Sequence, residues 1–190
     1  ADGKALGKLY WGFVFTVFAV VAAGSISPFW PVWFWYHPTA MLLAYLVFMG
    51  NAVLIKQLGG RTATKLHGFL MAAGTLSAAF GWYVIHSNKE KAGKQHFTTT
   101  HGLLGLICLL GTFLAALAGT LLLDPDFGVM TKSKVVRLVH KYSGRSLICF
   151  AFFVSVLGWF TNKQQKMLPT LLFSVPLAGF AFILIQKSQK

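Results

Sequence analysis

The chain has 190 residues, of which 56% are hydrophobic and 11% charged, and its mean hydropathy is +0.65. A soluble domain carries roughly 25% charged residues, so this composition excludes an ordinary soluble protein and predicts an all-α, polytopic membrane protein. The net charge of +13 is distributed over short links between apolar segments. We therefore expect the basic residues to set membrane topology and contact lipid head groups, and we expect no nucleic-acid binding.

Six apolar segments are predicted to form transmembrane helices of a single domain, residues 1–190. In chain order they cover approximately residues 9–27, 37–55, 66–86, 100–123, 140–161 and 168–186. The fourth segment has 22 uncharged residues from Gly102 to Leu123, and about 20 are enough for one helical crossing. The aromatic, uncharged link 28–36 is typical of a membrane interface.

Lysine and arginine are divided unequally between the two sets of links. The N-terminus, the second and fourth links and the C-terminus together hold eleven, whereas the first, third and fifth links hold five. Positive residues accumulate on the cytoplasmic side of a membrane. The sequence therefore predicts that both termini are cytoplasmic.

A histidine stands at the start of four successive spans, at His37, His67, His101 and His140. Because successive spans run in opposite directions, His37 and His101 share the outer level and His67 and His140 share the inner level. A 20-residue helix is about 30 Å long, which excludes a pair between the two levels. Facing imidazoles at two levels predict two bis-histidine haems in a central bundle of helices two to five.

Alternatives to haem ligation exist for these residues. A single such histidine would more often be an interfacial ring bonded to a carbonyl or water, but four at matched depths favour haem. Gly74 and Gly81 follow His67 at intervals of seven and predict a stripe without side chains that would leave room for a flat macrocycle. Glycines that simply allow close helix packing are the alternative.

The competing functional class is a histidine-bearing channel or carrier without haem. All four acidic residues lie in links or the N-terminal tail, so the spans contain no carboxylate, which disfavours a proton- or metal-coupled carrier. The chain also has no GxGxxG motif for a flavin or nicotinamide. The electron donor must then be a small molecule or another protein, and a cytochrome subunit that docks to a dehydrogenase is a third possibility.

Four short motifs surround the histidines: Trp35-Tyr36-His37-Pro38, Lys65-Leu66-His67-Gly68, Thr100-His101-Gly102-Leu103-Leu104-Gly105 and His140-Lys141-Tyr142-Ser143-Gly144. They resemble the four haem-ligand signatures of the cytochrome b561 family. The third link, with Val84-Ile85-His86 and Lys94-Gln95-His96, most resembles the short, domain-containing-protein-2 type of that family. The resemblance covers nearly the whole chain. It implies a six-helix, usually homodimeric oxidoreductase with two haem b groups per chain. Such a protein would transfer electrons from cytosolic ascorbate to monodehydroascorbate or ferric iron across the endoplasmic reticulum or another endomembrane.

The resemblance also assigns residues to the cytoplasmic donor. Lys65 and Arg61, two and six residues before the inner ligand of the third span, and Lys134, six before that of the fifth, match basic residues that surround ascorbate in the family. Ascorbate is a monoanion near neutral pH, so fixed cations would attract it. Setting membrane topology is the alternative role of each.

On the outer side the resemblance matches His86 to a family histidine near the second substrate, and we add His96. Either could hold an anion or a ferric ion, or accept a proton coupled to the electron. Replacement of an outer haem ligand by His86 is the rival interpretation. Arg145 lies five residues into the fifth span and needs a partner there. A haem propionate is our hypothesis, because arginine pairs bidentately with carboxylates, and snorkelling to the surface is the alternative.

Overall fold

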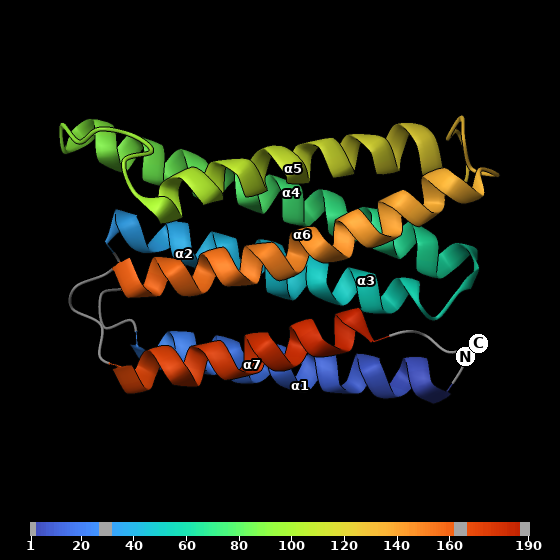
Figure 1. Cartoon of the computed structure of the whole chain (residues 1–190), viewed down its shortest axis with the longest axis horizontal. Coiled ribbons are helices and arrows are strands. Elements are labelled where there is room, and N and C mark those ends of the chain that lie inside the picture. Colours follow the sequence, from blue (N-terminus) through green and yellow to red (C-terminus); the bar gives the residue numbers. More distant parts are fainter. Residues whose placement is uncertain (1–2, 27–31, 162–166, 187–190) are drawn as a thin grey trace.

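The computed structural model describes residues 3–26, 32–161 and 167–186, and within these ranges it contains helices and no strands (Figure 1). The helices form a bundle of long, roughly antiparallel rods. In chain order they are α1 Gly3–Ile26, η1 Trp33–Trp35, α2 Tyr36–Leu42, η2 Leu43–Gly50, α3 Asn51–Lys56, α4 Gly60–Lys91, α5 Thr100–Leu123, α6 Lys134–Thr161 and α7 Met167–Ile185.

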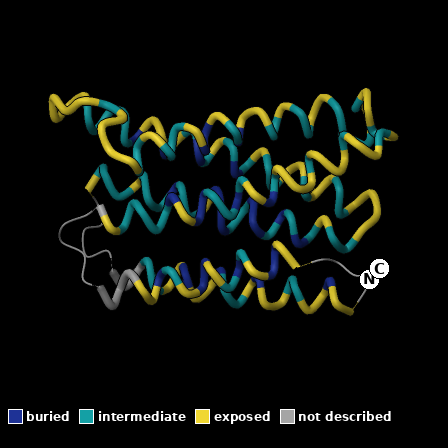
Figure 2. Tube along the Cα trace, viewed as in Figure 1, coloured by how far each residue is buried: buried dark blue, intermediate teal, exposed yellow. Residues whose placement is uncertain are grey.

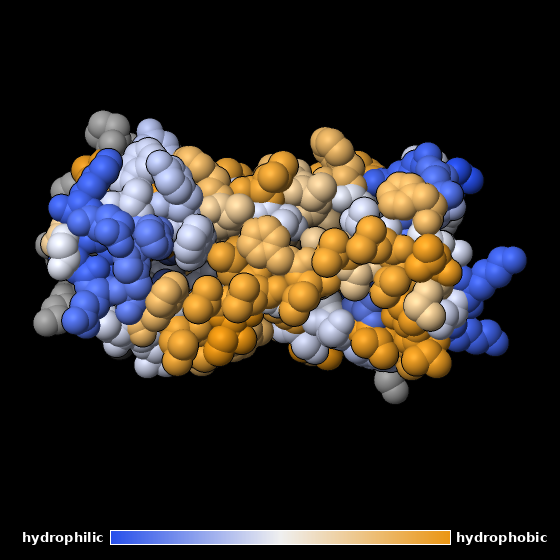
Figure 3. All heavy atoms as spheres, turned by 90° about the horizontal axis from the view of Figure 1, so that it is seen from above, coloured by the Kyte–Doolittle hydropathy of each residue, from blue (hydrophilic) through white to orange (hydrophobic). Residues whose placement is uncertain are grey.

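Within the described residues, five stretches of helix are long and apolar enough to cross a membrane, and a sixth, Leu171–Ile185, is shorter. The five are Gly3–Ala23, Trp33–Lys56, Gly60–Lys91, Thr100–Leu123 and Lys134–Phe160. Large apolar side chains project outward from them, and hydrophobic residues cover the middle of the visible face while hydrophilic residues gather at its two ends (Figure 3). This arrangement suits a lipid environment, and it confirms the predicted all-α, polytopic membrane fold.

The second span is one continuous rod built from η1, α2, η2 and α3, and its middle, Leu43–Gly50, is a π-helix. A π-helix widens each turn and redirects backbone carbonyls. Asn51 follows this segment, and its Nδ2 donates to the carbonyl oxygens of Leu46 and Val47, at 3.1 and 3.0 Å. The same amide donates to Thr16 Oγ1 of α1 at 3.0 Å. The side chain thus stabilises an irregular segment that sequence periodicity did not predict.

The core lies where this second rod meets its neighbours. The rod packs against α4, α5 packs against α6, and α7 packs against both α1 and α6. Buried residues lie along the second rod, α6 and α7, and the rod and α6 form the middle layer of the bundle (Figure 2). Tyr45 of the rod donates or accepts a buried hydrogen bond with Thr112 of α5, with 3.0 Å between the oxygens.

The two ends of the bundle carry different residues. The start of α1, the α3–α4 turn, the α5–α6 link and the end of α7 lie at one end, which we call the Lys65 end (Figure 1). The α4–α5 link lies at the other, the His86 end. Helix α4 is longer than the predicted 66–86, so Lys65 lies within its second turn and His86 within the helix itself. Gly59 and Gly60 make the preceding turn, each with a φ of +80°, which only glycine adopts readily.

Candidate functional site

His37 of α2 and His101 of α5 face each other toward the His86 end. Their ring centroids are 6.2 Å apart and the ring planes make an angle of 78°. Two imidazole nitrogens that bind one metal ion at about 2 Å each place their ring centres about 6 Å apart. The spacing of this pair therefore fits a single metal ion between the rings.

Backbone carbonyls of neighbouring helices hold three of the four span histidines. His37 Nδ1 donates to Gly81 O at 2.9 Å, His67 Nδ1 to Ala52 O at 3.0 Å and His101 Nδ1 to Val154 O at 3.0 Å. A carbonyl only accepts, so Nδ1 carries the proton and Nε2 keeps its lone pair. Histidines that ligate metals are oriented by such a bond from their other nitrogen.

Helices α5 and α6 accommodate each other's histidines at glycines. A Cβ on Gly158 of α6 would lie 2.8 Å from Cε1 of His101, and a Cβ on Gly119 of α5 would lie 3.1 Å from Cε1 of His140. Contacts this short leave no room for a side chain. Each histidine of this helix pair therefore depends on a glycine of the opposite helix. No local sequence pattern indicated that Gly158 would contact His101.

The glycine stripe on α4 has a different role from the one we predicted. A Cβ on Gly74 would meet Met49 Cγ at 2.7 Å, and one on Gly81 would meet Ala40 Cβ at 3.1 Å. These glycines allow α4 to pack closely on the second rod, which is the alternative stated above, and neither leaves an open gap for a macrocycle.

A cavity of about 510 Å³ adjoins His37 and His101, within the range of small-molecule and cofactor sites. Its walls are mostly apolar and aromatic and include Tyr45, Trp82 and Gly105. The side chains of His86 and His96 also line it. The cavity therefore offers a mostly apolar space beside the paired rings, and the imidazoles of His86 and His96 are among the polar groups that line it.

The two inner histidines are near enough that a charge on His140 would act on His67. Near this level Arg145 is only 9% exposed, and it forms no ion pair with any carboxylate in the described ranges. Lys8 of α1 is a further cation, close enough to Arg145 for the two positive charges to repel each other. The buried side-chain amide of Gln57, which follows α3 at the Lys65 end, has no hydrogen-bond partner among the residues that the structure describes. A buried arginine without a carboxylate partner in the described ranges, and an unsatisfied amide, fit a group that brings carboxylates, as the propionates of haem would.

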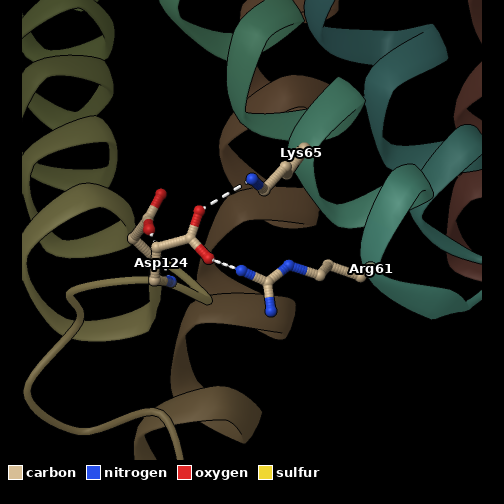
Figure 4. A network of polar contacts seen from close by, with 4 residues as sticks. Arg61, Lys65 and Asp124 are labelled. Carbon is tan, nitrogen blue, oxygen red and sulfur yellow. Dashed lines mark hydrogen bonds and ion pairs between the residues drawn. The ribbon is translucent and has the colours of Figure 1, made fainter.

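Arg61 and Lys65 are held together at the Lys65 end by a residue that sequence reasoning did not connect to them. Both pair with the carboxylate of Asp126 in the α5–α6 link, Lys65 at 2.8 Å. Figure 4 draws these two contacts as dashed lines and labels the neighbouring Asp124, whose Oδ1 accepts from the backbone amide of Asp126. The three side chains are 67%, 55% and 38% exposed, so the pairs contribute at most about 1 kcal/mol each. Lys134 begins α6 at the same end but forms no ion pair in the described part of the chain.

His86 and His96 meet at the opposite end. Their rings stack with centroids 4.2 Å apart and an interplanar angle of 16°. His96 Nε2 also lies 2.6 Å from Glu90 Oε1. Glu90 was not among the predicted site residues, although its position four residues after His86 on one helix would have indicated a shared face.

Comparison with known proteins identifies the family. The family described as eukaryotic cytochrome b561 matches residues 36–166. The chain is also 30% identical over 138 residues to the mouse (Mus musculus) protein named transmembrane reductase CYB561D2. That alignment covers 68% of this chain and 60% of the relative, so the chain spans about three fifths of the relative's length.

The chain therefore belongs to the cytochrome b561 family. Membership implies that it binds haem b, and the residues present fit that group. The facing His37 and His101 rings, their bonded Nδ1 atoms and the adjoining cavity suit a bis-histidine haem.

Replacing Gly158 with alanine should displace the His101 ring and lower the haem b retained per chain, because the new Cβ would lie 2.8 Å from that ring. Gly7→Ala in α1 is the matched control, since a Cβ there meets no described atom within 4 Å. Pyridine haemochrome assay of the two purified variants measures the difference. Equal haem retention would contradict the assigned contact.

Proposed function

We propose that the chain carries electrons across a membrane, from ascorbate at the Lys65 end to monodehydroascorbate or ferric iron at the His86 end. Two haem b groups per chain would take part, one held by His37 and His101 and the other by His67 and His140. The observation that carries this proposal is the facing His37–His101 pair beside an apolar cavity. The name of the mouse relative, a transmembrane reductase, supports it.

The haem irons, when bound, supply the one-electron chemistry. The protein's own contribution begins with the histidines, whose Nδ1–carbonyl bonds fix the ring orientation and the neutral tautomer. Apolar residues between the two levels exclude water and ions from the middle of the bundle. The hydrogen bond between Tyr45 and Thr112 satisfies the polar groups buried there, so neither is left unpaired.

At the donor end, Arg61 and Lys65 would bind the ascorbate anion, and Lys134 would add a third positive charge. In the structure a carboxylate, that of Asp126, already lies between Arg61 and Lys65. The position therefore accepts an anion, and ascorbate would displace Asp126 from it. Because all three partners are exposed, this exchange has a small cost.

At the acceptor end, His86 and His96 line the same cavity as His37 and His101. A small acceptor bound to them would be close to that cavity, and their imidazoles could accept or release a proton with the electron. His86 stacks on His96 rather than on either member of the outer pair, which supports an acceptor role over replacement of a haem ligand.

The surroundings of the protein are also part of the proposal. The excess of lysine and arginine at the Lys65 end supports cytoplasmic termini. A location in the endoplasmic reticulum or another endomembrane vesicle, and a homodimeric state, follow from the family resemblance alone.

Reconstitution into sealed vesicles tests the function directly. A ferric chelate is trapped inside, ascorbate is added outside, and ferrous iron inside is measured with a trapped chromogenic chelator. We expect iron reduction with the wild-type protein and none with empty vesicles or the His67→Leu variant. A haem-loaded protein that reduces no trapped acceptor would contradict the proposal.

Asp126→Asn should lower the ascorbate concentration for half-maximal haem reduction by about threefold, because a competing negative charge is removed from Arg61 and Lys65. The effect should shrink at high ionic strength. Stopped-flow reduction without an acceptor measures it. Glu90→Gln removes the same charge at the opposite end and should leave this concentration unchanged; an equal change in both variants would count against the proposed donor site.

Arg145→Gln should lower the midpoint potential of the inner haem by on the order of 50 mV, because a buried positive charge stabilises the reduced, less positive state. Redox titration followed by absorption checks this. Arg137→Gln makes the same change at an exposed position of α6. An unchanged potential in Arg145→Gln would rule out a propionate partner.

A further inference from the structure

Three potential metal ligands converge at the His86 end. They are His86, Glu90 and His96, and their ligating atoms all lie within 4.8 Å of one another. His86 and Glu90 are four residues apart near the end of α4, so they share one face of that helix. His96 returns from the following link to the same face, where both imidazole rings are half-buried.

The backbone after α4 brings His96 back. Gly93 adopts a φ of +61°, and the amides of Gly93 and Lys94 donate to Glu90 O and Lys89 O at 3.1 and 3.0 Å. Lys89 Nζ then donates to Gln95 O at 3.1 Å. These bonds close a tight reversal at the helix C-terminus. The position of His96 therefore follows from a hydrogen-bonded turn.

We propose that His86, Glu90 and His96 form a binding site for a divalent transition-metal ion of the Zn²⁺ or Cu²⁺ kind. Two imidazoles with one carboxylate are a common ligand set for such ions, and a fourth position stays open to water. Two nitrogen ligands out of three disfavour Ca²⁺ and Mg²⁺, which take oxygen ligands. The site uses none of the four histidines proposed to hold haem. It shares His86 and His96 with the proposed acceptor site, but binding of the ion does not depend on electron transfer.

Without a metal ion, a simple hydrogen-bonded His–Glu pair is the alternative account of the 2.6 Å contact between His96 and Glu90. A hydrogen bond between His96 and Glu90 does not account for the position of His86. The His86 ring takes no part in that bond, yet it stacks on the His96 ring. An ion would bind all three side chains after small rotations about their χ angles. Lys89, Lys91 and Lys94 are close in sequence, so we expect moderate affinity.

Zn²⁺ binding to the haem-loaded protein, purified without a histidine tag, tests this site. Isothermal titration calorimetry should find one ion per chain, and Glu90→Gln and His96→Gln should each weaken binding about tenfold or more. Asp124→Asn is the matched control, since it removes a carboxylate at the Lys65 end of the bundle. The affinity of this variant for Zn²⁺ should equal that of the wild type.

A second probe separates a local effect from misfolding. Co²⁺ should give visible ligand-field bands with the wild type and lose them in Glu90→Gln and His96→Gln, while the haem spectrum stays unchanged in every variant. No binding by the wild type, or equal affinity in all variants, would overturn the proposal. Reduction by ascorbate, recorded on the same samples, reports separately on electron transfer.

Discussion

The hydrogen bond from a histidine Nδ1 to a carbonyl of another helical segment is the interaction on which the proposed haem sites depend. The Nδ1 atoms of three histidines donate hydrogen bonds to carbonyl oxygens of other segments. His37 of α2 donates to α4, His67 of α4 to α3, and His101 of α5 to α6. Each bond fixes a ring and links two segments. The orientation of the metal-binding nitrogen therefore depends on helix packing, and a change in packing would alter the ligation of the iron.

Glycines lie at two of those three bonds, the ones made by His37 and His101. Close approach of α4 to the second rod at Gly81 brings its carbonyl to His37, and the α5–α6 contact places His101 against Gly158. In a membrane, where apolar burial gives little net attraction between helices, small residues and buried hydrogen bonds determine which faces meet. The helix contacts and the histidine positions thus have a common cause.

The two ends of the bundle differ in chemistry, as the proposed electron transfer across a membrane requires. At the Lys65 end, Arg61 and Lys65 share the carboxylate of Asp126, which the proposed ascorbate anion would replace. At the His86 end, two imidazoles and Glu90 gather beside the cavity. The basic residues of the Lys65 end would attract an anionic donor, and the imidazoles and carboxylate of the His86 end would bind a cationic or radical acceptor on the opposite side of the membrane.

The sequence predicted the helical class and the levels of the histidines, because hydropathy and the 1.5 Å rise per residue determine both. It could not predict contacts between distant segments. Asp126 is 65 residues from Arg61, and Gly158 is 57 from His101, so no local pattern joins them. The π-helix at Leu43–Gly50 was missed because its stabilising contacts come from Asn51 and the separate helix α1. The prediction that Gly74 and Gly81 leave room for a macrocycle was wrong. A seven-residue spacing places glycines on one face of a helix, but it does not show whether a cofactor or another helix packs against that face.

The most direct measurement of the central claim is the haem content of purified wild-type protein and of His101→Leu. Pyridine haemochrome assay with protein quantification should give two haems b per chain for the wild type and one for the variant. The remaining haem should keep the absorption spectrum of a bis-histidine centre. A colourless wild type, or a variant that retains every haem, would contradict ligation by histidine pairs at two levels of the bundle.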